Sequence, residues 1–132
     1  MVDSNVILDI VTEDTNWFHW SSQTLALYAD PHIFIINSII YSEISVGFEK
    51  MDEVDAILPP AHFRRMPIPW EAAFSAGKSF LQYRKRSGTK RSPLPDFFIG
   101  AYAEFLKLPL ITRDVARYRT CFPELTLISP VS

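Results

Sequence analysis

The sequence predicts a single α/β domain in which helices cover both faces of a doubly wound parallel sheet. Its 132 residues suffice for one hydrophobic core and leave no room for a second domain. Short apolar runs typical of strands alternate along the chain with segments of helical periodicity, and this order is typical of parallel sheets. No repeat or long linker interrupts the alternation. We therefore expect one domain over residues 1–132.

In the first half of the chain, the strands are short and the helices have clear end signals. Met1 and Val2 precede Asp3, so the first strand is unusually brief. Residues 33–36 are all β-branched or aromatic, as in a strand covered on both faces, and Asn37 can cap the helix that follows. The sequence predicts helices near residues 6–10, 14–30 and 39–48 and a second strand over residues 33–36.

The second half continues the alternation and contains a basic segment. The expected elements are helices near residues 51–58, 70–83, 92–106 and 113–119 and strands near residues 63–68, 108–112 and 125–128. Residues 84–91 are basic, small and polar, which indicates a helix end that runs into an exposed loop. Pro93 is typical of a first helical turn, which places Asp96 near the start of its helix.

Charge is distributed unevenly along the chain. Residues 1–49 carry seven acids and no lysine or arginine, whereas residues 50–132 carry thirteen bases and eight acids. An acidic site beside a basic rim would produce this asymmetry. Two solvated faces without a specific partner would also produce it, so both interpretations stay open at this point.

Four acidic residues are expected at the carboxyl edge of the sheet, where doubly wound folds bind their ligands. Asp3 and Asp114 lie at the carboxyl ends of two predicted strands, and Glu43 and Asp96 lie on helices next to strands. Clustered carboxylates repel one another, so the arrangement makes physical sense mainly if Mg²⁺ or Mn²⁺ neutralises it. A hard divalent ion held by carboxylates can activate water for attack on a phosphodiester. The four acids therefore indicate nuclease chemistry.

Each aspartate also has a simpler structural interpretation. Asp3 and Asp114 could cap the helices that follow them, and Asp96 could stabilise a helix dipole from the first turn. Taken singly, these roles are the more common ones. Glu43 is different, because it lies beside the apolar stripe of its helix, where an unpaired carboxylate costs roughly several kcal/mol. Glu43 therefore needs a metal ion or a basic side chain as a partner.

Four short segments carry a family resemblance. They are Val-Asp-Ser-Asn-Val-Ile-Leu-Asp at residues 2–9, Tyr-Ser-Glu-Ile at 41–44, Pro-Asp-Phe-Phe-Ile-Gly-Ala-Tyr-Ala at 95–103 and Leu-Ile-Thr-Arg-Asp at 110–114. In order and spacing, they resemble the PIN-domain ribonucleases of the VapC type, and the resemblance covers nearly the whole chain. It implies a three-layer α/β/α domain with a central twisted parallel sheet. It also implies one or two Mg²⁺ or Mn²⁺ ions and hydrolysis of RNA by metal-activated water.

The resemblance assigns roles to six residues. It implies that Asp3, Glu43, Asp96 and Asp114 bind the metal ions and that Ser4 and Thr112 orient ligands or water around them. Two features depart from the family pattern. The first strand is stunted, and Gly100 stands where the family commonly has alanine. Neither departure removes a proposed ligand.

Basic residues close to the acids in the predicted fold are candidates for RNA contact. Those in the basic segment are Arg84, Lys85, Arg86, Lys90 and Arg91. They could guide a phosphate backbone toward the acids, or they could form an ordinary solvated loop. Arg113 follows a predicted strand directly, where its guanidinium could touch the scissile phosphate.

The sequence also predicts partners. Helical spacing and aromatic content mark the segment with Trp17, Trp20, Thr24, Leu27 and Tyr28 as a buried stripe. Together with Phe18, its aromatic rings exceed what one helix face easily buries, so they either belong to the core or partly form a partner groove. The family resemblance implies an antitoxin that covers such a groove and presents a basic side chain to the acids. It also implies a homodimer.

Localisation follows from what the sequence lacks. The acidic start is unlike a signal peptide, and no apolar run approaches the roughly 20 residues of a membrane helix. We therefore expect a cytoplasmic protein without a membrane partner.

Two other functions are compatible with parts of this pattern. A PIN-fold subunit that processes or only binds RNA would share the same residues and lack an antitoxin. A Mg²⁺-dependent phosphoacceptor signalling module would need an acceptor aspartate after a central strand and a lysine after a later one. Asn37 and Ser38 follow residues 33–36 instead, and no lysine follows residues 108–112, so the sequence disfavours this module.

Overall fold

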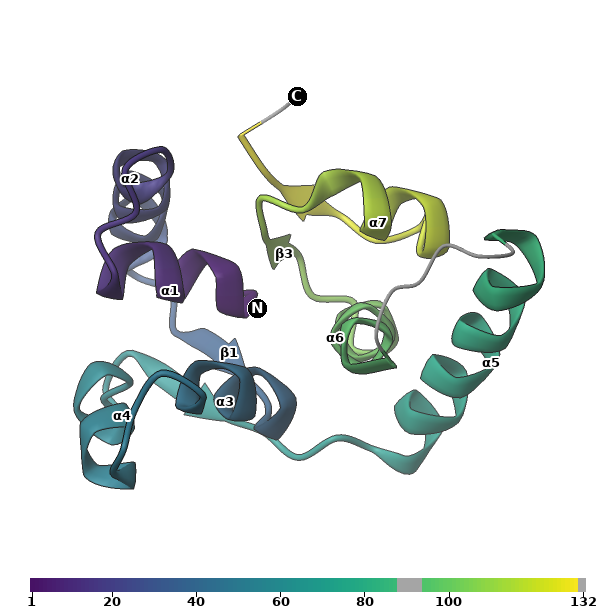
Figure 1. Ribbon diagram of the computed structural model, residues 1–132, viewed down its shortest axis with the longest axis horizontal. Helices are drawn as coiled ribbons and strands as arrows, with labels where there is room; N and C mark the ends of the chain where they lie inside the picture. Colours follow the sequence, from purple (N-terminus) through teal and green to yellow (C-terminus); the bar gives the residue numbers. More distant parts are fainter. Residues whose placement is uncertain (88–93, 131–132) are drawn as a thin grey trace.

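Parallel strands from both halves of the chain form the centre of the fold (Figure 1). The structure is a computed structural model that describes residues 1–87 and 94–130. Strand β1 (Phe34–Ile36) pairs in parallel with β2 (Phe63–Arg65). Strand β3 (Leu110–Ile111) pairs in parallel with β4 (Leu127–Ile128). The predicted α/β class with parallel strands is therefore confirmed.

The N-terminal segment joins these two strand pairs. Val2 forms a parallel bridge to Ile111, and the Val2 N–H donates a hydrogen bond of 3.2 Å to the Ile35 carbonyl on the other side. The Asp3 N–H donates to the Ile111 carbonyl at 2.9 Å. The spatial order is therefore β2, β1, residues 1–3, β3 and β4. The first strand can be brief because backbone partners hold it on both sides.

Helices connect the strands and pack around them. They are α1 (Ser4–Val11), α2 (Phe18–Tyr28), α3 (Ser38–Ser45), α4 (Met51–Ile57), α5 (Trp70–Ser87), α6 (Leu94–Phe105) and α7 (Val115–Cys121). Helix α1 contacts α2 and α3, α3 contacts α4 and α6, and α5 contacts α6. As predicted, the Asn37 side chain caps α3 by accepting from the N–H groups of Ile39 and Ile40, both at 3.0 Å.

Helix α6 lies in the core, between α5 and the N-terminal segment (Figure 1). Phe97, Ile99 and Tyr102 are fully buried, as expected of a helix that is apolar on nearly every side. Gly100 faces the ring of Phe122, and a Cβ at Gly100 would come within 2.4 Å of Phe122 Cε2. The close approach of this ring explains why glycine stands at a position where the family that the sequence resembles commonly has alanine.

Helix α2 differs from the predicted buried stripe. It begins at Phe18, because Asp14 accepts hydrogen bonds in the turn that precedes it. Its buried residues are Ser21 and Thr24, whereas Leu27 is 73% exposed. The prediction that Leu27 is buried was wrong, because α2 turns a polar face toward α1. Ser21 there donates to buried Asp9 at 2.9 Å.

Helix α5 is longer than predicted. It continues to Ser87 rather than ending near residue 83. Arg84, Lys85 and Arg86 are therefore exposed on its last turns rather than on a loop. Long basic side chains favour helices and interact well with the dipole at a C-terminus, which explains the extension. Lys90 and Arg91 lie outside the described residues.

No helix within the described ranges combines the length and the apolarity that a membrane span would require.

Candidate active site

Asp3 lies at the centre of the candidate site. It is 4% exposed and caps α1 by accepting from the Ser4 N–H at 2.8 Å. Its second oxygen, Oδ2, accepts from Thr112 Oγ1 at 2.8 Å and from the Tyr118 hydroxyl at 3.0 Å. The capping role therefore coexists with a position at the carboxyl edge of the sheet. Donors from α1, α7 and the segment after β3 fix this carboxylate.

Ser4 connects Asp3 to Glu43. Its hydroxyl donates to Glu43 Oε1 at 2.9 Å and lies 3.5 Å from Asp3 Oδ1. Glu43 reaches this position from α3, which packs against α1. The serine that follows the first strand is thus placed between two of the four predicted acids.

Arg117 connects the other two acids. Its Nη1 atom lies 2.8 Å from Asp96 Oδ2 and 2.9 Å from Asp114 Oδ2. Asp96 is in the first turn of α6, and Asp114 precedes α7. The Asp114 side chain makes no capping hydrogen bond to α7, although its N–H donates to Thr112 Oγ1 at 3.0 Å. The capping interpretation of Asp114 therefore does not describe its side chain.

The acids influence one another electrostatically. Burial is the main reason that the pKa values of Asp3, Glu43 and Asp96 are raised. Repulsion adds to this effect, because Asp3 and Asp96 raise the pKa of Glu43 and Asp114 raises the pKa of both Asp3 and Asp96. Arg117 opposes the shifts at Glu43 and Asp96. The site is thus an acidic cluster whose negative charge is only partly compensated.

The donor set has the chemistry of a site for a hard divalent ion. Carboxylate and hydroxyl oxygens are the ligands that Mg²⁺ and Mn²⁺ prefer, and such an ion would favour the ionised form of these acids. Within residues 1–87 and 94–130, no three acidic, histidine or cysteine side chains are already arranged around one ion position. The acids instead form two pairs, one linked by Ser4 and one by Arg117.

Arg113 makes an ion pair outside this cluster. Its Nε and Nη2 atoms donate to the two carboxylate oxygens of Asp9 at 2.8 and 2.9 Å. Asp9 is 2% exposed and also accepts from Ser21, and the guanidinium carbon lies 5.5 Å from the centre of the Trp17 ring. The contact of Arg113 with RNA phosphate stays a prediction. In the structure its guanidinium links α1 to the segment after β3.

Several contacts of the site did not follow from the sequence. Arg117, which the sequence suggests only as part of a basic surface, and Tyr118 contact the predicted acids directly, and Asp9 binds Arg113. A signal for Arg117 was available, since it follows Asp114 by three residues on a helix, a spacing at which side chains meet. Asp9 could have been found as a carboxylate on an apolar helix, which needs a cation.

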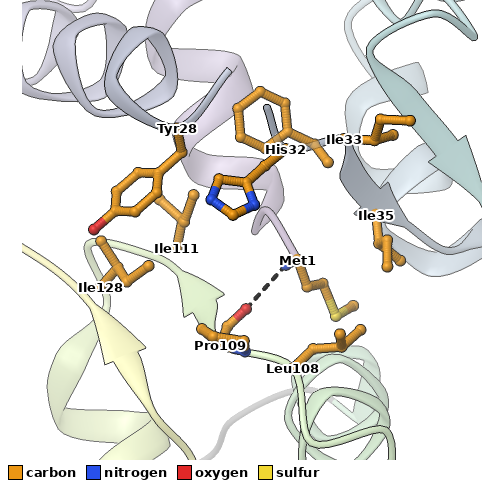
Figure 2. Close-up of a pocket in the computed structure, with 10 residues that line it drawn as sticks. Met1, Tyr28, His32, Ile33, Ile35, Leu108, Pro109, Ile111 and Ile128 are labelled. Atoms are coloured by element: carbon orange, nitrogen blue, oxygen red, sulfur yellow. Dashed lines mark hydrogen bonds between the residues drawn. The ribbon is translucent and has the colours of Figure 1, made fainter. Parts of the chain in front are cut away.

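An apolar pocket of about 250 Å³ lies near the starts of the strands, away from the acids (Figure 2). Met1, Tyr28, His32 and Pro109 contribute to its lining, and the amino group of Met1 donates to the Pro109 carbonyl at 2.9 Å. The pocket contains no acidic side chain. The candidate active site is therefore the acidic cluster and not this pocket.

Comparisons with known proteins place this geometry in context. No match was found among curated proteins. Among solved structures, the chain is similar to a chain of VapBC2 from Rickettsia felis bound to a promoter DNA fragment, with 17% identity and a TM-score of 0.73 over 98% of this chain and 96% of that one. It is similar to a chain of FitAcB from Neisseria gonorrhoeae, with 20% identity and a TM-score of 0.71 over 98% and 96% of the two chains.

A chain of a toxin–antitoxin complex from Klebsiella pneumoniae is similar as well, with 23% identity and a TM-score of 0.67 over 98% and 95% of the two chains. At these identities the likeness concerns the fold. The family description "PIN domain" matches residues 1–123 of this sequence. Because this match spans most of the sequence and the fold agrees with it, the chain belongs to the PIN domain family.

Proposed function

We propose that this protein is a metal-dependent endoribonuclease that acts in the cytoplasm as the toxin of a VapBC-type toxin–antitoxin module. The observation that carries the proposal is the convergence of Asp3, Glu43, Asp96 and Asp114 at one edge of the sheet. The similar structures include VapBC2, FitAcB and a toxin–antitoxin complex from Klebsiella pneumoniae, and the last of these supports an antitoxin as the protein partner. A homodimer is part of the same proposal.

In this proposal, the four acids hold Mg²⁺ or Mn²⁺. A bound divalent ion supplies Lewis acidity toward a phosphodiester and lowers the pKa of water. The protein contributes the positions of the ligands. Thr112 and Tyr118 donate to Asp3 Oδ2 and keep that carboxylate at the strand end, which supports a fixed orientation for its other oxygen.

Glu43 is placed to handle a proton. It is partly exposed, and burial together with the neighbouring acids Asp3 and Asp96 raises its pKa above the ordinary value of a glutamate. Ser4 holds its Oε1 atom, so the other oxygen can accept a proton from the attacking water. As the water oxygen bonds to phosphorus, the phosphorus–oxygen bond to the leaving ribose breaks and the ribose oxygen takes up a proton from solvent water. No covalent intermediate with the protein forms.

The basic end of α5 is the proposed guide for the RNA backbone. Arg84, Lys85 and Arg86 are exposed on its last turns. Helix α5 packs against α6, which carries Asp96, so a backbone bound there lies on a helix that neighbours the acids. Lys90, Arg91 and Arg113 belong to the same proposed RNA-binding set.

The test is cleavage of RNA by the purified protein with Mn²⁺ or Mg²⁺. Asp96→Asn should abolish cleavage and keep the fold, because it removes a ligand charge and retains the size of the side chain. Asp52→Asn is the matched control, since Asp52 is exposed on α4 and makes the same charge change. Undiminished cleavage by Asp96→Asn would refute the assignment. Metal-independent RNA binding without cleavage by the unmodified protein would favour an RNA-binding subunit instead.

A further inference from the structure

Arg117 places a positive charge inside the acidic cluster. Its Nη1 atom is within 2.9 Å of one oxygen of Asp96 and one oxygen of Asp114, two residues that come from different parts of the fold. A single guanidinium nitrogen therefore bridges two carboxylates that are 18 residues apart in the sequence. Asp96 and Asp114 are two of the four acids that the proposed function assigns to the metal.

The contact is accessible to solvent on one side. The Arg117 side chain is 32% exposed, Asp114 is 37% exposed and Asp96 is 12% exposed. Because the Arg117 side chain and Asp114 are partly exposed, water can replace the hydrogen bonds that the guanidinium loses when it leaves the acids, and the contact with Asp114 contributes little to stability. Asp3 and Glu43 do not depend on Arg117 for their hydrogen bonds, since Ser4, Thr112 and Tyr118 supply those.

We propose that Arg117 is a built-in counter-ion that competes with the divalent ion for Asp96 and Asp114. This inference rests on the proposed function, because it assumes that these acids bind the metal. Without metal, the guanidinium compensates the two carboxylates and keeps them in position. Metal binding displaces the guanidinium toward solvent. Arg117 thus acts as a positioning residue that sets how much divalent ion the site requires.

A purely structural role for Arg117 would change the Mn²⁺ affinity in the opposite direction when the arginine is removed. If the arginine only supports the shape of the site, its removal should loosen the acids and weaken metal binding. If it competes, its removal should strengthen metal binding. The direction of the change in Mn²⁺ affinity therefore separates the two roles, independently of RNA cleavage.

The experiment measures the Kd of Mn²⁺ by electron paramagnetic resonance of the free ion, with the full chain at constant ionic strength. Arg117→Gln and Arg117→Met both remove the charge, and Met keeps the aliphatic length of the side chain. We expect the Kd of Mn²⁺ to fall five- to tenfold, which corresponds roughly to the free energy of one or two partly exposed ion pairs. Arg117→Lys keeps the charge and should stay within about twofold of the unmodified protein.

Arg119→Gln is the matched control, because Arg119 is exposed on the same helix and makes the same change in net charge. Its Kd should stay unchanged. Equal Kd values for Arg117→Gln, Arg117→Met and the unmodified protein, or weaker binding by the variants, would overturn the inference while leaving the metal site in place. Absence of Mn²⁺ binding in every variant would overturn both the inference and the proposed function.

Discussion

Replacing Arg113 by methionine should destabilise the fold more than replacing Asp9 by asparagine. The two side chains form a two-point ion pair with N–O distances of 2.8 and 2.9 Å. They differ in burial, because Asp9 is 2% exposed and the Arg113 side chain is 32% exposed. The partner left behind therefore decides the cost of each substitution.

Arg113→Met leaves a buried carboxylate whose remaining side-chain donor is Ser21. Breaking a buried pair in this way costs about 3–5 kcal/mol. Asp9→Asn leaves a guanidinium that water can reach and an amide oxygen that can still accept one hydrogen bond, so the loss is about 1.5–3 kcal/mol. For a domain of this size, each kcal/mol corresponds to roughly 3–4 °C in Tm.

Urea unfolding followed by circular dichroism measures both free energies, and the double variant completes a thermodynamic cycle. We expect the double variant to lose less stability than the sum of the single variants, because neither unpaired charge remains. Additive losses, or a loss below about 1 kcal/mol for Arg113→Met, would show that the pair does not form in solution. Arg113 would then be free for RNA, as the sequence predicts.

Two further predictions concern packing and pH. Gly100→Ala should destabilise the protein by about 1–3 kcal/mol because its Cβ would collide with Phe122. Gly77 lies on the exposed side of α5, where an added Cβ has nothing within 4 Å, so Gly77→Ala should stabilise the protein by about 0.5–1 kcal/mol. Urea unfolding measures both changes in the free energy of unfolding, and two changes of the same sign would contradict this description of the packing. Glu43→Gln keeps the Ser4 hydrogen bond and removes a carboxylate whose pKa is raised in the folded state, so without metal it should be more stable than the unmodified protein at neutral pH. Because its pKa is raised, Glu43 binds its proton more tightly in the folded state than in the unfolded state, so the stability of the unmodified protein falls as pH rises above about 4. Glu43→Gln should therefore be more stable than the unmodified protein by under about 1 kcal/mol at neutral pH, and this difference should vanish below about pH 4. A pH-independent difference in Tm would contradict this reasoning.

Much of the fold could be predicted from the sequence because it depends on backbone pattern. Runs such as residues 33–36 and end signals such as Asn37 define elements locally, and parallel strands bring their carboxyl ends to one edge. The placement of Asp3 and Asp114 follows from that geometry. The strand boundaries were less predictable, since β3 has only two paired residues and depends on the N-terminal segment beside it.

The charge pairs could not be predicted in the same way. Whether Arg117 turns toward Asp114 or toward solvent depends on Asp96, which approaches from another helix. The sequence predicts that Arg113 contacts RNA, and its partner in the structure, Asp9, comes from α1, 104 residues earlier in the chain. Such contacts depend on tertiary structure, where several side chains compete for one cation.

A crystal structure of the protein soaked in Mn²⁺, with anomalous scattering measured at the manganese edge, would locate the metal directly. We expect a manganese peak among Asp3, Glu43, Asp96 and Asp114, with the guanidinium of Arg117 turned away from Asp96. A peak located elsewhere, or none at these acids while Arg117 still bridges Asp96 and Asp114, would contradict this expectation.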